Sequence, residues 1–272
     1  MPVYRIPPKK RNFLLNMSLS NQLIFINIIT FFIGIVLFKV YGENFVLNNI
    51  ALNPSMILSG KSLWTLITCM FMHGSFFHLF ANMFSLFFIG NFLERIIGRK
   101  RFFGVYIISG IIGGAFFVLA SLIMGDVNTS AVGASGAIFG LLGVLVLLVP
   151  YSKVYFIAGP LILILLDVVV SPFIPLNVVG AWDFVVNILI FVMILSLFSF
   201  NSKLRRFSIP IELPMWLVPI IAIVPLSIIS FFVELPIGNS AHFGGLVAGL
   251  IYAFYLINKF PNKTKRLRVH FR

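Results

Sequence analysis

The sequence predicts an all-α polytopic membrane protein, a helical bundle with eight spans. Of its 272 residues, 60% are hydrophobic and 10% charged, and the mean hydropathy is +1.08. A soluble domain of this length could not cover so much apolar surface with polar side chains. The chain also contains eight apolar runs near the roughly 20 residues that a bilayer requires, separated by short basic segments. These observations together exclude a soluble globular class.

The eight runs follow one another with one long interruption. They lie near 22–41, 76–97, 102–124, 135–151, 154–171, 182–200, 214–234 and 240–258. The first follows basic residues without a small-residue cleavage site, which predicts a retained signal anchor. The segment from Tyr41 to Ser75 contains Pro54 and Trp64, and we expect an interfacial loop with short helices there. The predicted divisions are a basic N-terminus (1–21), a membrane domain (22–258) and a basic tail (259–272).

Basic residues predict the orientation of the spans. The net charge is +13, but the lysines and arginines stand between apolar runs with few aromatic residues among them, so we expect no nucleic-acid partner. A cytoplasmic N-terminus leaves only Lys39 and Lys61 outside. Both termini of this multi-pass cell-membrane protein are therefore predicted to be cytoplasmic. The basic residues assigned to the cytoplasmic loops between spans are Arg95, Arg99, Lys100, Arg101, Lys153, Lys203, Arg205 and Arg206.

Two helix starts carry a nucleophile and a base. Ser135 begins the fourth run between Gly133 and Gly136, and His242 begins the eighth run, followed by Gly245 and Gly249. Glycines four residues apart let helices approach closely in lipid. Three runs separate the two helices, so both helices run from outside to inside and their first residues share one face of the membrane. A serine activated by an imidazole can attack a carbonyl, and hydrolysis requires a water-filled cavity beside it.

A third polar group lies at the start of the second run. His78 and Asn82 are four residues apart and share a helix face. Two donors directed at one point suit a developing oxyanion. His73, at the mouth of the same helix, is either a structural hydrogen-bonding residue or a functional one.

These motifs together resemble the rhomboid family of intramembrane serine proteases. The resemblance rests on His73-x4-His78-x3-Asn82, Gly133-Ala134-Ser135-Gly136 and Ala241-His242-x2-Gly245-x3-Gly249, in that order, with Gly90-x3-Glu94 late in the second run. It implies a six-helix core and a Ser135–His242 dyad without a catalytic aspartate. It also implies an oxyanion hole from Asn82, His78 and the Ser135 backbone amide. Substrates would be transmembrane proteins in the bilayer, and no cofactor is required.

The chain departs from the family pattern in three places. Three spans instead of one separate serine from histidine, so an extra helical hairpin is predicted at about 154–200, which leaves 214–234 as the family's fifth span and lateral gate. Phe139 stands where some members place a tyrosine, so it could stack on the histidine but not hydrogen-bond. Trp64-Thr65 replaces a frequent Trp-Arg pair.

The residues also suggest two other kinds of catalytic centre. His73, His78 and His242 could form a metal site, but the first two are five apart and lack the glutamate of the His-Glu-x-x-His pattern, so no metal is predicted. Asp167 and Asp183 could form a paired-aspartate protease, but no motif flanks them, and a hydrogen bond to a neighbouring helix is the simpler role.

The functional prediction is an intramembrane serine endopeptidase whose cavity opens to the outer face. One alternative is a catalytically silent rhomboid-like protein that binds membrane clients, although such proteins typically lack the serine or the histidine. The other is a transporter, against which the absence of paired broken helices in matching halves weighs. Loss of cleavage on replacing Ser135 or His242 would separate these three.

Overall fold

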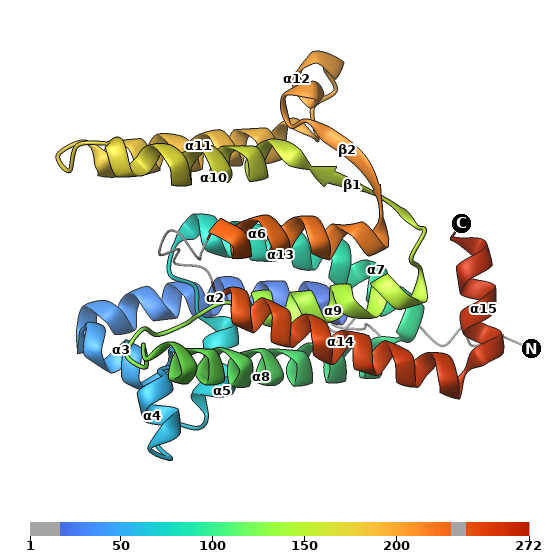
Figure 1. The fold of residues 1–272 in the computed structure, drawn as a ribbon, viewed down its shortest axis with the longest axis horizontal. Helices are drawn as coiled ribbons and strands as arrows, with labels where there is room; N and C mark the ends of the chain where they lie inside the picture. Colours follow the sequence, from blue (N-terminus) through green and yellow to red (C-terminus); the bar gives the residue numbers. More distant parts are fainter. Residues whose placement is uncertain (1–16, 230–237, 272) are drawn as a thin grey trace, which may run out of the picture.

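The fold is a bundle of helices with one small strand pair (Figure 1). The computed structural model describes residues 17–229 and 238–271, so the N-terminal sixteen residues and the end of the predicted 214–234 span lie outside the described residues. The helices are α2 (Leu19–Tyr41), α3 (Glu43–Asn49), α4 (Pro54–Leu58), α5 (Thr65–Thr68), α6 (Phe76–Ser85), α7 (Asn91–Ile97), α8 (Arg99–Met124), α9 (Ser135–Leu148), α10 (Ala158–Val170), α11 (Val179–Ser196), α12 (Ser202–Phe207), α13 (Val218–Ile229), α14 (Asn239–Lys259) and α15 (Pro261–His270). The strands are β1 (Lys153–Ile157) and β2 (Pro210–Pro214). The short 3-10 helices are η1 (Cys69–Phe71), η3 (Ser171–Phe173) and η4 (Met215–Leu217), and η2 (Leu86–Gly90) is a π-helical segment that joins α6 to α7.

The prediction of an all-α polytopic membrane protein is confirmed. Within the described residues, five helical segments are long and apolar enough to cross a membrane: Leu19–Tyr41, Phe76–Ile97, Arg99–Met124, Val179–Ser196 and Asn239–Lys259. The other three predicted runs contain shorter apolar helices, at Ser135–Leu148, Ala158–Phe173 and Met215–Pro225. The segment between the first two spans forms the short helices α3, α4 and α5, as expected.

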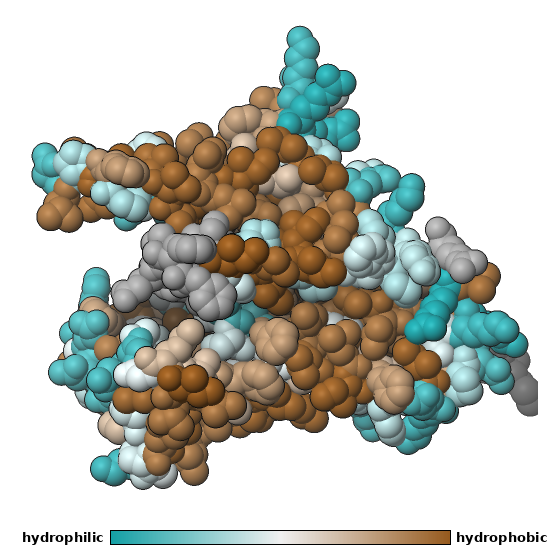
Figure 2. Space-filling view, viewed as in Figure 1, coloured by the Kyte–Doolittle hydropathy of each residue, from teal (hydrophilic) through white to brown (hydrophobic). Residues whose placement is uncertain are grey.

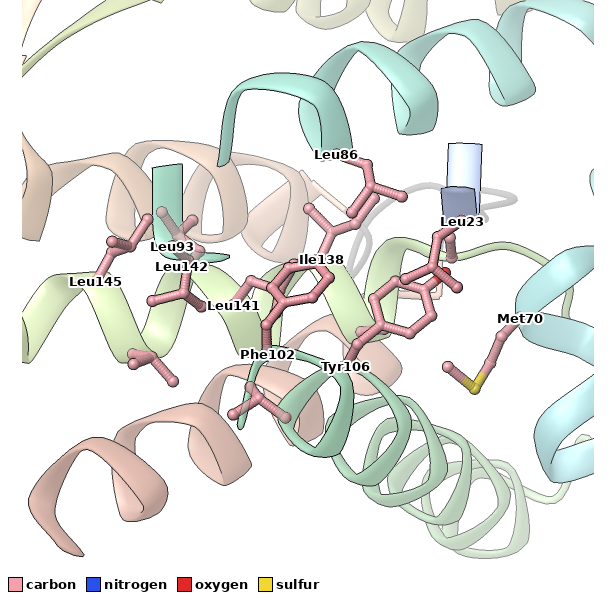
Figure 3. Close-up of a cluster of buried hydrophobic side chains, with 14 of the residues drawn as sticks. Leu23, Met70, Leu86, Leu93, Phe102, Tyr106, Ile138, Leu141, Leu142 and Leu145 are labelled. Carbon is pink, nitrogen blue, oxygen red and sulfur yellow. The ribbon is translucent and has the colours of Figure 1, made fainter. Parts of the chain in front are cut away.

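Helix α9 lies in the middle of the bundle and packs against both α8 and α14 (Figure 1). Ten of its fourteen residues are buried and they lie on every face, as expected for a helix that is apolar all round. Figure 3 shows the core that α8 and α9 share, where the Phe102 ring lies beside Ile138 and Leu141, and Tyr106 lies toward Leu23 and Met70. A rigid central helix of this kind gives its first residue a fixed position.

Residues 153–214 correct the predicted start of the fifth span. The run predicted at 154–171 begins as β1, which pairs antiparallel with β2 from Lys153 opposite Pro214 to Ile157 opposite Pro210. The strand pair closes the base of helices α10, α11 and α12, which lie between its two strands in the chain. Helix α11 contacts α6 through Phe191, whose ring lies against Phe76, Phe77 and Phe80.

The C-terminal tail contains a helix that the sequence analysis did not predict. Helix α15 follows Phe260 and turns back across the end of α9 (Figure 1). The Arg268 guanidinium donates to the Leu147 carbonyl at 2.7 Å, which occupies one of the last carbonyls of α9. Figure 2 shows a broad apolar surface along the helices with polar residues gathered toward both helix ends, the distribution of a membrane-spanning bundle.

Candidate active site

Ser135 is positioned by a loop that is held against the neighbouring helices. The loop after α8 pairs through Ala131 with Leu52, and the Gly133 amide donates to the Cys69 carbonyl at 2.8 Å. Gly133 has φ of +126°, a conformation that favours glycine. Ser135 then opens α9, and no side chain among the described residues caps this helix start. Backbone amides of the first helical turn therefore remain available beside the hydroxyl.

His242 lies in the first turn of α14, which packs directly on α9. A Cβ on Gly245 would collide with the Gly136 carbonyl oxygen, and a Cβ on Gly249 would collide with the Gly140 carbonyl oxygen. Only glycine permits this approach of two backbones in lipid. The close packing brings His242 Nε2 to 2.7 Å from Ser135 Oγ, a hydrogen bond between residues 107 positions apart in the chain.

An aromatic ring holds the imidazole on its other side. Phe139, one turn after Ser135, stacks on His242 with ring centroids 4.6 Å apart and an interplanar angle of 24°. The contact fixes the plane of the imidazole by packing, since phenylalanine cannot hydrogen-bond to it.

The His78 ring lies close to the same serine. A Cβ on Gly133 would be 2.8 Å from His78 Cε1 and Nε2 and 3.8 Å from Ser135 Oγ, so the ring and the hydroxyl border the same small space. Asn82 is buried one turn later on α6, and its side-chain amide donates to the His78 carbonyl at 2.9 Å, which uses one of its two hydrogens. The His78 ring therefore lies close to the serine, and Asn82 is bonded to the His78 backbone on the same helix face.

His73 is the least exposed of these histidines and packs edge-on against His78, with ring centroids 5.1 Å apart. Neither of its ring nitrogens has a hydrogen-bond partner among the described residues. Within those residues no three His, Cys, Asp or Glu side chains gather as metal ligands. Asp167 of α10 accepts a hydrogen bond from the Trp182 indole of α11 at 2.6 Å. This pair lies on other helices than those that carry Ser135 and His242.

Glycines of α8 and of the middle of α9 complete the close packing, and they were not predicted as site residues. A Cβ on Gly113 would lie 2.7 Å from the Ala241 carbonyl oxygen, and one on Gly143 would lie 2.5 Å from the Leu246 carbonyl oxygen. The signal was present as small residues in α8, at Gly110, Gly113 and Gly114, but their partner helix was not evident. The residues Gly133, Gly136, Gly245 and Gly249 do lie at the site. The site contains the Ser135 hydroxyl, the His242 imidazole hydrogen-bonded to it, and the hydrogen-bond donors His78 and Asn82 on α6. These groups together suit acyl transfer.

Comparisons with known proteins agree on one family. A family model described as the rhomboid domain matches residues 60–183 and 179–259, more than half of the chain. RHOMBOID-like protein 1 of Arabidopsis thaliana is 46% identical over 93 residues, 34% of this chain and 23% of that protein. YdcA of Bacillus subtilis (strain 168), whose name marks it as a candidate rhomboid protease, is 41% identical over 90 residues, 33% of this chain and 43% of its own.

Inactive RHOMBOID-like protein 8 of Arabidopsis thaliana is also similar, with 34% identity over 87 residues, 32% of this chain and 23% of that protein. The matched parts thus cover less than half the length of these relatives.

Proposed function

Because this multi-pass membrane chain belongs to the rhomboid family, we propose that it is a serine endopeptidase that cleaves transmembrane segments of other membrane proteins. The observation that carries the proposal is the 2.7 Å hydrogen bond between His242 Nε2 and Ser135 Oγ at the starts of two adjoining helices. Neither a serine nor a histidine is needed to pack these apolar helices. Polar and ionisable residues within a membrane are energetically costly, and they usually mark functional sites.

In the proposed reaction, Ser135 Oγ attacks the scissile carbonyl while His242 Nε2 accepts the hydroxyl proton. The tetrahedral oxyanion is stabilised by the backbone amide of Ser135, by His78 and by Asn82, whose side-chain amide keeps one hydrogen beyond the one that it donates to the His78 carbonyl. The positive end of the α9 dipole adds to this stabilisation because the serine is the first residue of the helix.

The intermediate then breaks down in two steps. The peptide C–N bond breaks and the amine leaves with the proton held by His242, which leaves an acyl ester on Ser135. Water that enters from the outer face gives a proton to His242 and attacks the ester; the ester C–O bond then breaks, His242 returns the proton to Ser135 Oγ, and the product leaves as a carboxylic acid. Phe139 keeps the imidazole in one orientation through both transfers. No cofactor takes part.

The proposal includes a location and an orientation. The described helices suit a cell membrane, with substrates that reach the site within the bilayer and both termini in the cytoplasm. We retain the division into an N-terminal segment (1–21), a membrane domain (22–258) and a tail (259–272), and treat 153–214 as an insertion into a six-helix core.

The test is cleavage of a labelled transmembrane substrate by the full-length protein in proteoliposomes. We expect cleavage by the native chain, and loss of it in Ser135→Ala and in His242→Ala. A fluorophosphonate probe should label the native protein and not Ser135→Ala, because it requires the activated hydroxyl. Ser130→Ala, a serine in the preceding loop, is the matched control and should remain active and labelled.

Cleavage that persists in both variants would refute the serine mechanism. A folded native protein could instead resist the probe and cleave none of a panel of transmembrane substrates, yet capture some of them. That result would identify a silent client-binding member of the family, in which one plant relative is named inactive.

A further inference from the structure

A groove lies between α8 and α14 on a side of the bundle that the proposed chemistry does not use. It has a volume of about 270 Å³ and is bordered by Lys100, Arg101, Gly104, Val105, Ile108, Ser109, Ala248 and Tyr252. Its floor at Gly104 is open, because a Cβ there would meet nothing within 4 Å. The groove therefore has room for an extended ligand chain alongside α8.

The two ends of the groove differ in chemistry. Lys100 and Arg101 are exposed in the first turn of α8, where the helix meets the polar zone. Beyond them the lining is mostly apolar, with the hydroxyls of Ser109 and Tyr252 as its polar groups, and Ile108 is 57% exposed. A ligand that matches this pattern has an anionic head followed by a hydrocarbon chain.

The positive charge of Lys100 and Arg101 is not neutralised by the protein. In the part of the chain that the structure describes, the single ion pair joins Lys153 to Glu212 of the strand pair. The carboxylate of Glu94, on the preceding helix, accepts instead from backbone amides of α2. The guanidinium of Arg101 lies 4.9 Å from the centre of the Phe260 ring, in the neighbouring hollow that both residues border, and Arg101 also borders the groove.

We propose that this groove binds an anionic phospholipid of the surrounding bilayer. The phosphate of the lipid head lies between Lys100 and Arg101, and one acyl chain follows Gly104 and Ile108 along the seam between α8 and α14. Basic pockets between transmembrane helices suit anionic lipid heads because each nearby cation contributes about 1 kcal/mol to their attraction. A free phosphate ion would leave the apolar length of the groove unfilled. The proposal does not depend on proteolysis.

The experiment is equilibrium binding of fluorescent phosphatidylglycerol to the full-length protein in neutral detergent, with fluorescent phosphatidylcholine as the uncharged-head probe. We expect the native chain to prefer phosphatidylglycerol. Lys100→Gln combined with Arg101→Gln should weaken phosphatidylglycerol binding by roughly 25-fold and leave phosphatidylcholine unchanged. Gly104→Leu should weaken both probes, because its side chain fills the space of the acyl chain.

Two matched controls separate this site from general effects. Lys203→Gln with Arg205→Gln removes the same number of charges from exposed α12, and Gly180→Leu adds the same side chain in open space on α11. Both should bind like the native protein. Equal binding of the two lipids by the native chain, or equal loss in the α12 control, would overturn the proposal. Displacement of the lipid by millimolar inorganic phosphate would show a simple anion site and also overturn it. If the double variant does not fold, Gly104→Leu and the phosphate competition decide.

Discussion

At the scale of single residues, the site depends on where side chains are missing as much as on where they are present. Ser135 and His242 could be identified from the sequence, because the parity of the intervening spans puts both helix starts on one side of the membrane. The contact between Gly133 and the His78 ring could not be identified that way. It arises from a loop conformation with positive φ, and a glycine in a sequence does not disclose which backbone angle it adopts.

Gly133→Ala tests this contact. The added Cβ would lie 2.8 Å from the His78 ring and would occupy the space beside Ser135 Oγ, so we expect kcat/KM for a transmembrane substrate to fall by about 100-fold. Gly125→Ala is the comparison: its φ of +77° lies in the left-handed region, which costs an alanine about 1–2 kcal/mol, and nothing lies within 4 Å of the new Cβ. Equal losses in both variants would mean that backbone strain, and not the His78 contact, explains the effect.

At the scale of helices, the distance between serine and base is set by the packing of α14 on α9. The four-residue spacing of glycines predicted this contact face, since it places small residues along one side of each helix. The partners from α8 were not predicted, because Gly113 acts through its contact with the Ala241 backbone, which requires knowing that α8 lies against α14. The β1–β2 pair was missed for a similar reason: a short apolar strand cannot be told from the start of an apolar helix by composition.

Gly245→Ala should separate the two helices. Its Cβ would overlap the Gly136 carbonyl oxygen, and relief of such overpacking costs about 1–3 kcal/mol and a shift of the backbone. We expect a lower thermal midpoint in detergent and loss of fluorophosphonate labelling at Ser135, because the shift breaks the bond to His242. Gly180→Ala, where a Cβ meets nothing, should retain both properties. Unchanged labelling in Gly245→Ala would show that the helices tolerate the larger residue.

Glu94 connects the second span to the first. Its two carboxylate oxygens each accept a backbone amide of the α2 start, from Leu19 and Ser20, both at 2.8 Å. The carboxylate therefore caps the helix and lies at the positive end of its dipole. We expect Glu94→Ala to lower the free energy of unfolding by about 1–2 kcal/mol, measured by denaturant titration in detergent. Glu43→Ala is the comparison of equal charge, and a loss as large there would contradict the capping role.

At the scale of the whole molecule, hydrophobicity and the distribution of charge determine most of what could be predicted. Each of the eight apolar runs contains a helix in the described part of the chain, five of them long enough to cross a membrane, and the apolar surface runs along the helices (Figure 2). The docking of the inserted hairpin could not be predicted, because Phe191 meets α6 through aromatic packing between residues more than a hundred positions apart. In lipid such contacts depend on shape and not on a hydrophobic driving force, so composition does not reveal them.

The orientation of the bundle in the membrane can be measured by thiol labelling, because Cys69 is easily removed as the background thiol. This cysteine is the only one in the sequence and is buried, so Cys69→Ala supplies a background without thiols. Lys61→Cys and Lys203→Cys each add one exposed thiol to that background. If both termini are cytoplasmic, a membrane-impermeant maleimide added to intact cells should label position 61, and should label position 203 only after the membrane is opened.

The reverse labelling pattern would have a direct consequence for the site. The loop that presents Ser135 is bonded to the segment containing Leu52 and Cys69, which lies between the first two spans together with Lys61. The serine therefore enters the membrane from the face on which position 61 is found. Labelling of position 203 in intact cells would place that face in the cytoplasm, and the water for hydrolysis and the exposed part of each substrate would then come from inside the cell.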